Sequence, residues 1–127
     1  MQPPTKTTTI ISRAPSCCVI TPGELVAPAP VIPETAWQIE AILGPRSEAA
    51  FLRLITSGKL EVVDLTLDDY ERCITLIETY QDLGLGLVDA SVVTVAENRG
   101  ARTLASLNHR DFTVVRPRHG GAFELIP

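Results

Sequence analysis

The chain has 127 residues, of which 45% are apolar and 5% aromatic, and its net charge is -4 at pH 7. This length fits one small domain with a single, mostly aliphatic core. A net anion is poorly suited to bind nucleic acid over its whole surface, because phosphates repel it wherever basic residues or metal ions are not concentrated. Cys17, Cys18 and Cys73 are odd in number and form no CxxC pair, which indicates neither a disulfide framework nor a zinc site.

The longest apolar runs are far shorter than a membrane span, and no charged segment precedes a hydrophobic stretch as in a signal peptide. We therefore expect a cytoplasmic protein with no membrane partner. The charges are unevenly distributed: five arginines lie between residues 99 and 118 against one acid, Asp111, whereas residues 34–97 are acidic. This pattern fits a phosphodiester substrate bridged by a metal ion, and it fits an ordinary solvated surface equally well.

Residues 1–22 are rich in Thr, Pro and Ser and have no clear assignment; they are either a strand with a tail, or disordered. We place the folded domain at residues 23–127. Residues 23–27 are predicted to form a short strand, and a helix is expected over 33–43, where Gly44-Pro45 ends it. A second helix is expected over 47–57, with Ser47 as its N-cap.

A strand is predicted at 60–63, followed by a helix over 68–80 that Thr66 and Asp69 begin with a pattern like a capping box. Tyr70, Ile74 and Ile77 are its expected apolar face. A mostly buried helix over 87–98 comes next, and further strands are predicted at 101–105, 114–115 and 123–126. Strands that alternate with helices predict an α/β fold with a mostly parallel central sheet.

Two acids flank the loop that leads into the buried helix, Asp82 before it and Asp89 in the first helical turn. A carboxylate in a first turn is stabilised by the helix dipole, so Asp89 by itself could be purely structural. In an α/β sheet, however, sites form beyond the carboxyl ends of the strands. Asp89, Glu34 in the first turn of an earlier helix, and the loop after the 101–105 strand are therefore expected to converge there. Two converging carboxylates are close to the minimum that Mg²⁺ requires.

Several stretches carry a family resemblance. They are Val31-Ile-Pro-Glu34, Leu83-Gly-Leu-Gly-Leu-Val-Asp-Ala-Ser91, the segment from Arg102 to Phe112, and the ending Val115-Arg-Pro-Arg-His-Gly-Gly-Ala-Phe-Glu-Leu-Ile-Pro127. Together they resemble a PIN-domain ribonuclease of the VapC toxin type over roughly residues 23–127. The resemblance implies a three-layer α/β sandwich, an acidic cluster that binds Mg²⁺ or Mn²⁺, and cleavage of RNA. It also implies a cognate antitoxin, encoded in the same operon, and a homodimer.

Matched position by position, Glu34 corresponds to the family's second acid and Asp89 to its third, which makes both candidate catalytic residues and metal ligands. Asp82 corresponds to an auxiliary acid. The family's Thr-x-Asp is present as Ser106-Leu107-Asn108, so an amide that carries no charge takes the place of an anionic ligand. Asp111, three residues later, could supply a carboxylate if this segment forms a helical turn.

The family's first acid has no counterpart, because no Asp or Glu precedes Glu24. Residues 1–22 are thus an N-terminal segment altered relative to the family. Two of four acids are missing, which leaves two hypotheses open: an active metal-dependent endoribonuclease, and a degenerate PIN domain that acts only by binding an antitoxin or another subunit. An unrelated small-molecule binder would require the motif matches to be accidental.

Overall fold

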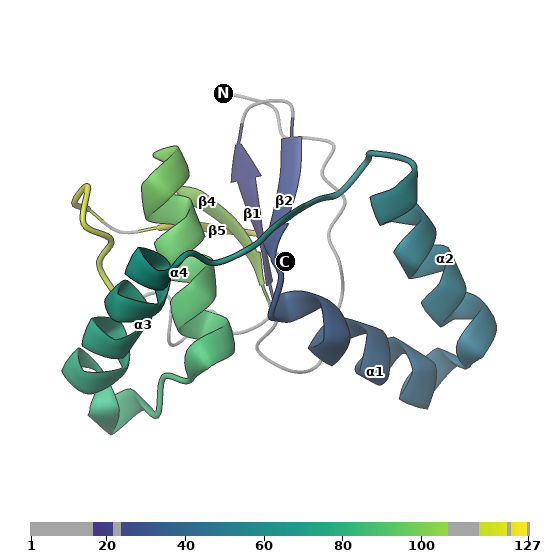
Figure 1. The fold of residues 1–127 in the computed structure, drawn as a ribbon, viewed down its shortest axis with the longest axis horizontal. Helices are drawn as coiled ribbons and strands as arrows, with labels where there is room; N and C mark the ends of the chain where they lie inside the picture. The colour runs from purple at the N-terminus through teal and green to yellow at the C-terminus, as the bar shows by residue number, and fades with distance from the viewer. Residues whose placement is uncertain (1–16, 22–23, 107–114, 122, 127) are drawn as a thin grey trace.

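A computed structural model describes residues 17–21, 24–106, 115–121 and 123–126. Within these residues five strands form one sheet in the order β3-β2-β1-β4-β5 (Figure 1). The strands are β1 (Cys17–Thr21), β2 (Glu24–Pro28), β3 (Glu61–Val63), β4 (Thr103–Ser106) and β5 (Glu124–Ile126). The segment before residue 23, which the sequence did not assign, thus contributes the central strand of the sheet.

The expected mostly parallel sheet is confirmed, because four of the five described strands run in one direction and only β1 runs the other way. The outer pairs β2–β3 and β4–β5 are parallel, but β1 runs antiparallel to both of its neighbours, β2 and β4. Only two residues separate β1 from β2. A link of that length allows a hairpin, whereas a parallel pair needs a crossover of a dozen residues or more. The short link therefore explains the direction of β1.

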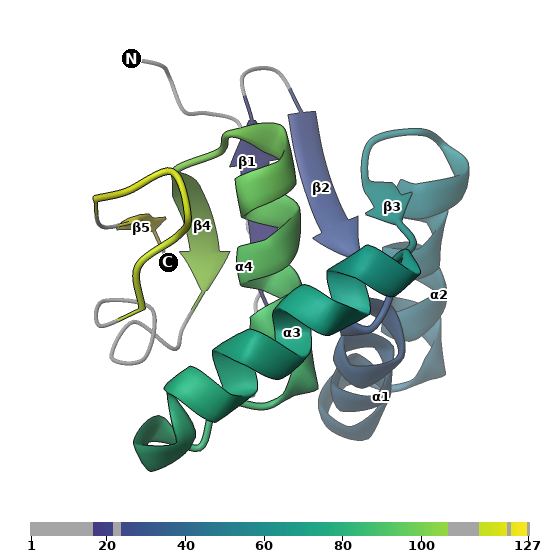
Figure 2. The same cartoon turned by 60° about the vertical axis from the view of Figure 1, so that its left-hand side comes forward.

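The described helices are α1 (Val31–Leu43), α2 (Pro45–Thr56), α3 (Leu67–Thr79) and α4 (Leu87–Arg99), with a short 3₁₀ turn, η1 (Gln81–Leu83), before α4. Figure 2 shows α4 lying against one face of the sheet with α3 outside it, while α1 and α2 form a hairpin beyond the β3 side. The predicted α/β class is confirmed.

The α4 helix is the centre of the core. Its residues from Asp89 to Ala96 are all buried, and Val92, Val93 and Val95 are at most 1% exposed. The sheet covers one side of the helix and α3 covers another, so α4 has no wide polar face. The prediction of a mostly buried helix is confirmed. Each valine contributes on the order of 1.5–3 kcal/mol when its side chain leaves water.

The start of α3 is as predicted, but its buried face is not. The Thr66 hydroxyl accepts from the Asp69 backbone N–H at 3.1 Å, and the Asp69 carboxylate accepts from Thr66 N–H at 2.9 Å, which completes the capping box. Two residues of the predicted apolar face are exposed, Tyr70 by 44% and Ile74 by 49%. Cys73 and Leu76 are buried instead, because α3 turns that side toward α4.

The junction of α1 and α2 also differs from the prediction. The second helix begins at Pro45, in place of the expected Ser47 cap, and Gly44 precedes it with φ +94°. That backbone conformation is strained for any residue with a Cβ, so a glycine suits the sharp change of direction between the two helices. Pro45 then occupies a first helical position, where its missing N–H costs nothing.

Candidate metal centre

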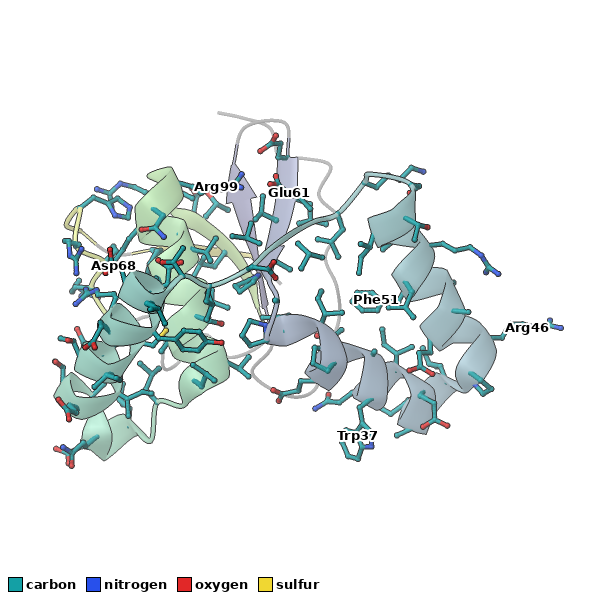
Figure 3. All side chains as sticks on the ribbon, in the orientation of Figure 1. Trp37, Arg46, Phe51, Glu61, Asp68 and Arg99 are labelled. Atoms are coloured by element: carbon teal, nitrogen blue, oxygen red, sulfur yellow. The ribbon has the colours of Figure 1, made fainter. Side chains whose placement is uncertain are left out.

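The ion pairs of α4 fix the direction in which the helix crosses the sheet. Arg99, in its last turn, donates to Glu61 at 2.8 Å and to Glu24 at 3.4 Å, and these acids are the first residues of β3 and β2 (Figure 3 labels Arg99 and Glu61). The last turn of α4 therefore lies where β2 and β3 begin. Its first turn, with Asp89, lies toward the opposite edge, where β2 ends and α1 begins.

Glu34 and Asp89 therefore lie at the same edge of the sheet, each in the first turn of a helix. Asp89 is 5% exposed, while Glu34 is half-buried. Helix N-termini present free N–H groups and a partial positive charge, which favour ionised carboxylates at both positions. Neither first turn contains a lysine or arginine. The structure thus places the two first turns at the same edge of the sheet, and their convergence into one site stays a prediction.

The other candidate residues have different positions. Asp82 is exposed on η1, between α3 and α4. Ser106 ends β4 at the edge that carries Asp89, and its backbone pairs with that of Cys17. Asn108 and Asp111 lie outside the described residues.

The first strand brings no acid to this edge. Because β1 is antiparallel to β2 and β4, it begins at Cys17 where those two strands end. A cysteine therefore stands at the start of the central strand, beside the place where the two candidate acids gather. The missing first acid of the family motif has no substitute within the described part of β1.

Thr35 is a buried polar residue that the sequence analysis did not single out. It is 0% exposed and follows Glu34 directly, and its hydroxyl has no hydrogen-bond partner within the described residues. A buried hydroxyl that lacks a partner costs about 1–3 kcal/mol, so such groups generally hold water or a ligand. The only signal in the sequence was its place beside a candidate ligand.

The oxygen donors at this edge fit a hard divalent cation, although their number is close to the minimum that such an ion needs. Mg²⁺ and Mn²⁺ prefer carboxylate, carbonyl and water oxygens, and Mg²⁺ commonly takes one or two carboxylates with waters and substrate phosphate. Glu34 and Asp89 provide two carboxylates. Within the described ranges no group of three or more His, Cys, Asp or Glu side chains forms a metal site.

The opposite end of α4 has a different chemistry. Glu97 accepts two hydrogen bonds from Arg72, at 2.9 and 2.7 Å, and a third from the Arg118 backbone N–H at 2.6 Å. Asn98 donates to Asp69 at 2.9 Å. Burial disfavours the charge of Asp69, but the hydrogen bonds from Thr66 and Asn98 outweigh it and lower the pKa of this carboxyl. These contacts join α3, α4 and the C-terminal segment.

Between α3 and α4 the remaining polar contact is that of the Cys73 thiol with the Thr94 hydroxyl, at 3.6 Å. Burial raises the pKa of Cys73, which keeps the thiol neutral and unreactive at pH 7. This cysteine is therefore a packing residue. No described helix is both long and apolar enough to cross a bilayer.

Comparison with known proteins supports the predicted resemblance. The PIN domain profile matches residues 8–116. Ribonuclease VapC26 of Mycobacterium tuberculosis is 30% identical over 115 residues, which are 90% of this chain and 85% of the relative. The crystal structure of VapC20 from Mycobacterium tuberculosis, described as a sarcin–ricin loop cleaving toxin, superposes with a TM-score of 0.59 at 20% identity. That superposition covers 65% of this chain and 64% of VapC20, just under two thirds of its length, and it supports the fold alone.

Proposed function

Since the chain belongs to the PIN domain family, we propose that it is a metal-dependent endoribonuclease, the toxin of a VapBC-type toxin–antitoxin system. The observation that supports this proposal is the placement of two acidic first turns, with Glu34 and Asp89, at the same edge of the sheet, where β2 and β4 end. The 30% identity to a VapC ribonuclease over most of the chain supports the same activity.

Glu34 and Asp89 are the residues that would hold the ion, Mg²⁺ or Mn²⁺. Once bound, the ion supplies a Lewis acid that activates water and stabilises charge on the phosphoryl oxygens of the RNA. The burial of Asp89 holds its carboxylate in place and limits the access of bulk water. The Thr35 hydroxyl can orient a water beside Glu34. Asn108, which follows β4, offers an amide oxygen as a third ligand, with Ser106, Asp82 and Asp111 as auxiliary residues.

The proposal includes a cognate antitoxin, a homodimer and a cytoplasmic location. An exposed apolar surface supports binding to a protein partner: on α1, Trp37 is 66% exposed, Ile42 59% and Leu43 66%. Trp37 points away from the helix into solvent (Figure 3) and lines a shallow, mostly apolar hollow of about 330 Å³ with Gln38, Ala41 and Ile42. Apolar patches of this kind are typical of protein interfaces.

The second candidate function is a PIN domain that binds its partner but does not cleave RNA. The specific observation in its favour is the start of β1, where Cys17 and no acid lies at the edge at which β2 and β4 end. With two carboxylates, the charge available to offset the dehydration of Mg²⁺ is small. The apolar surface of α1 would serve this function equally well.

The test is cleavage of a mixed RNA panel by the purified chain in Mn²⁺ and in Mg²⁺, with and without EDTA. Asp89→Asn removes a candidate ligand and is expected to reduce cleavage at least 100-fold. Substituting a residue that only hydrogen-bonds to a metal ligand already lowers metal affinity or activity by about 10–100-fold. Glu40→Gln is the control, since Glu40 is an exposed acid near the other end of α1, six residues after Glu34. It should leave the rate unchanged.

Cleavage that requires the metal and is lost in Asp89→Asn alone would establish the nuclease. Cleavage that survives Asp89→Asn would mean that this acid is no ligand. A folded sample that cleaves no RNA with either metal, and still binds its antitoxin, would establish the binding-only function.

A further inference from the structure

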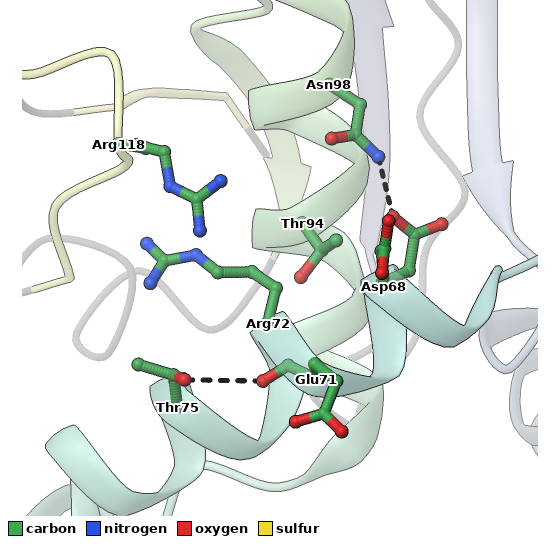
Figure 4. A pocket seen from close by; sticks show the side chains of 8 residues that line it. Asp68, Glu71, Arg72, Thr75, Thr94, Asn98 and Arg118 are labelled. Carbon is green, nitrogen blue, oxygen red and sulfur yellow. Dashed lines mark hydrogen bonds between the residues drawn. The ribbon is translucent and has the colours of Figure 1, made fainter.

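A polar groove of about 500 Å³ lies between α3 and α4, and the C-terminal segment closes one of its sides (Figure 4). It is distinct from the candidate metal centre. The groove is lined at Thr94 and Asn98, whereas Asp89 lies nine residues before Asn98 on the same helix. At 1.5 Å per residue, Asp89 is separated along α4 by about 7.5 Å from Thr94, five residues away, and by about 13.5 Å from Asn98.

Arg72 is the fixed cation of the groove. Its guanidinium donates to both oxygens of Glu97, and the two side chains are only 17% and 5% exposed. The hydrogen bond to Glu97 is the main reason that the pKa of Arg72 is raised, so this arginine is always charged. The Glu97 carboxylate also accepts a hydrogen bond from the Arg118 backbone N–H at 2.6 Å, which brings the C-terminal segment to the rim of the groove.

Arg118 is the second cation, and its guanidinium is not used by the fold. Within the described residues this guanidinium makes no hydrogen bond or ion pair; only its backbone N–H is bonded. Figure 4 shows the Arg118 guanidinium directed toward that of Arg72. Two like charges that face each other repel, and a single acid, Glu97, serves both residues. Arg72, Glu97 and Arg118 together keep one net positive charge.

Two of the three acids that line the groove, Asp68 and Asp69, lie apart from these arginines, and the third, Glu71, directs its carboxylate away from both guanidinium groups (Figure 4). In Figure 4 the two guanidinium groups are on one side of Thr94, while Asp68 and Asn98 are on the other. Asp69, in addition, is bonded through both carboxylate oxygens, to Thr66 N–H and to the Asn98 amide. The half of the groove beside Arg118 is therefore cationic, although the groove as a whole contains acids.

We propose that Arg118 and Arg72 form a phosphate-binding subsite that holds a backbone phosphate of the RNA at a distance from the scissile bond. A guanidinium matches the oxygens of a phosphate with paired hydrogen bonds, and an anion between two arginines relieves their repulsion. The identity of the ligand as RNA rests on the proposed function. A free phosphate ion presents the same oxygens and is the alternative source.

The experiment measures the binding of a fluorescein-labelled single-stranded RNA by anisotropy, in EDTA and over a series of salt concentrations. EDTA removes the metal, so the result does not depend on cleavage. Arg118→Gln deletes the charge and leaves the backbone hydrogen bond to Glu97 in place, since the side chain makes no hydrogen bond or ion pair within the described residues. We expect affinity to fall about 3-fold to 10-fold, and the slope of log K against log salt to become shallower by about 0.7, the value for one phosphate contact on a single strand.

Two variants serve as controls. Arg46→Gln removes an exposed arginine from the far side of the molecule, on α2 (Figure 3), and should change neither affinity nor slope. Arg118→Lys keeps the charge but loses the paired geometry, so it should retain the slope and give an intermediate affinity. A separate NMR titration with inorganic phosphate follows the Arg118 Nε–H resonance.

The proposal is overturned if the chain binds no RNA in EDTA, or if Arg118→Gln and Arg46→Gln weaken binding equally. It is also overturned if inorganic phosphate shifts the Arg118 resonance while RNA affinity does not depend on Arg118, since the ligand is then a free phosphate. RNA binding that depends on Arg118, in a chain that cleaves nothing with Mn²⁺ or Mg²⁺, would support this subsite and reject only the proposed chemistry.

Discussion

The two ends of α4 use their charged residues in opposite ways. At the last turn, Glu97 and Arg99 pair with partners on α3, β2 and β3, and they fasten the helix to the rest of the molecule. At the first turn, Asp89 lies toward Glu34 of α1, in a region where neither first turn contains a cation. Opposite charges that meet stabilise a fold, whereas acids that gather at one edge destabilise it unless a cation binds there. The contrast separates an end that fastens the helix from the end at which we propose the metal centre.

Removing Glu97 should have the largest effect on stability. Glu97→Gln would leave Arg72 charged and mostly buried beside a neutral amide, and the Arg118 N–H would lose its charged acceptor. Breaking a buried ion pair costs about 3 kcal/mol or more, so the free energy of unfolding should fall by that order. Urea denaturation measures it.

Arg99→Gln is the matched control, because its ion pairs with Glu61 and Glu24 are more exposed. Exposed pairs are worth about 0.2–1 kcal/mol. An equal loss of unfolding free energy in the two variants would contradict the view that the buried Arg72–Glu97 pair contributes most of the stability at this end of α4.

A change at the other end should alter metal binding. Asn108→Asp adds a carboxylate after β4, which ends at the edge that carries Asp89. If the proposed centre binds metal weakly because it has only two carboxylates, the added charge should raise Mn²⁺ affinity about 10-fold, which is about 1.4 kcal/mol. The rate of RNA cleavage should rise as well. Isothermal titration measures the affinity.

The same substitution on an Asp89→Asn background should give little gain, because the new ligand would lack a partner. A chain in which Asn108→Asp improves neither affinity nor cleavage would exclude residue 108 from the metal centre.

The smallest effect is expected at the start of α3. Asp69→Asn removes the ionised half of the capping box with Thr66 and should cost about 1 kcal/mol at pH 7. The pKa of Asp69 is lowered below its usual 3.8 in the folded chain. The contribution of ionised Asp69 to the free energy of unfolding is therefore complete above about pH 5. It is lost as the pH falls through the folded pKa, which lies below 3.8.

Denaturation curves at pH 7 and pH 3 test this sign. The stabilities of the parent chain and Asp69→Asn should differ at pH 7 and approach each other at pH 3. A difference that persists unchanged at pH 3 would show that packing, and not the charge of Asp69, is the cause.

Local signals in the sequence determined several elements. The Thr66 and Asp69 capping box and the buried character of α4 were both predicted, because each depends on residues within a few turns of one helix. The family motif identified the fold and the two acids, Glu34 and Asp89, for the same reason: each lies in a short, characteristic run. The sequence did not single out the Thr35 hydroxyl, because its burial depends on how α1 packs.

Contacts between distant segments decided the rest. The central place of β1 in the sheet followed from its pairing with β4, across more than eighty residues of sequence. The exposed position of Tyr70 and Ile74 followed from the side that α3 turns to α4, because both of its faces contain apolar residues. The groove between Arg72 and Arg118 exists only when α3, α4 and the C-terminal segment meet at Glu97. The sequence by itself thus determined the local elements and the candidate acids, and the tertiary structure decided which faces they share, because burial and charge pairing depend on neighbours that are remote along the chain.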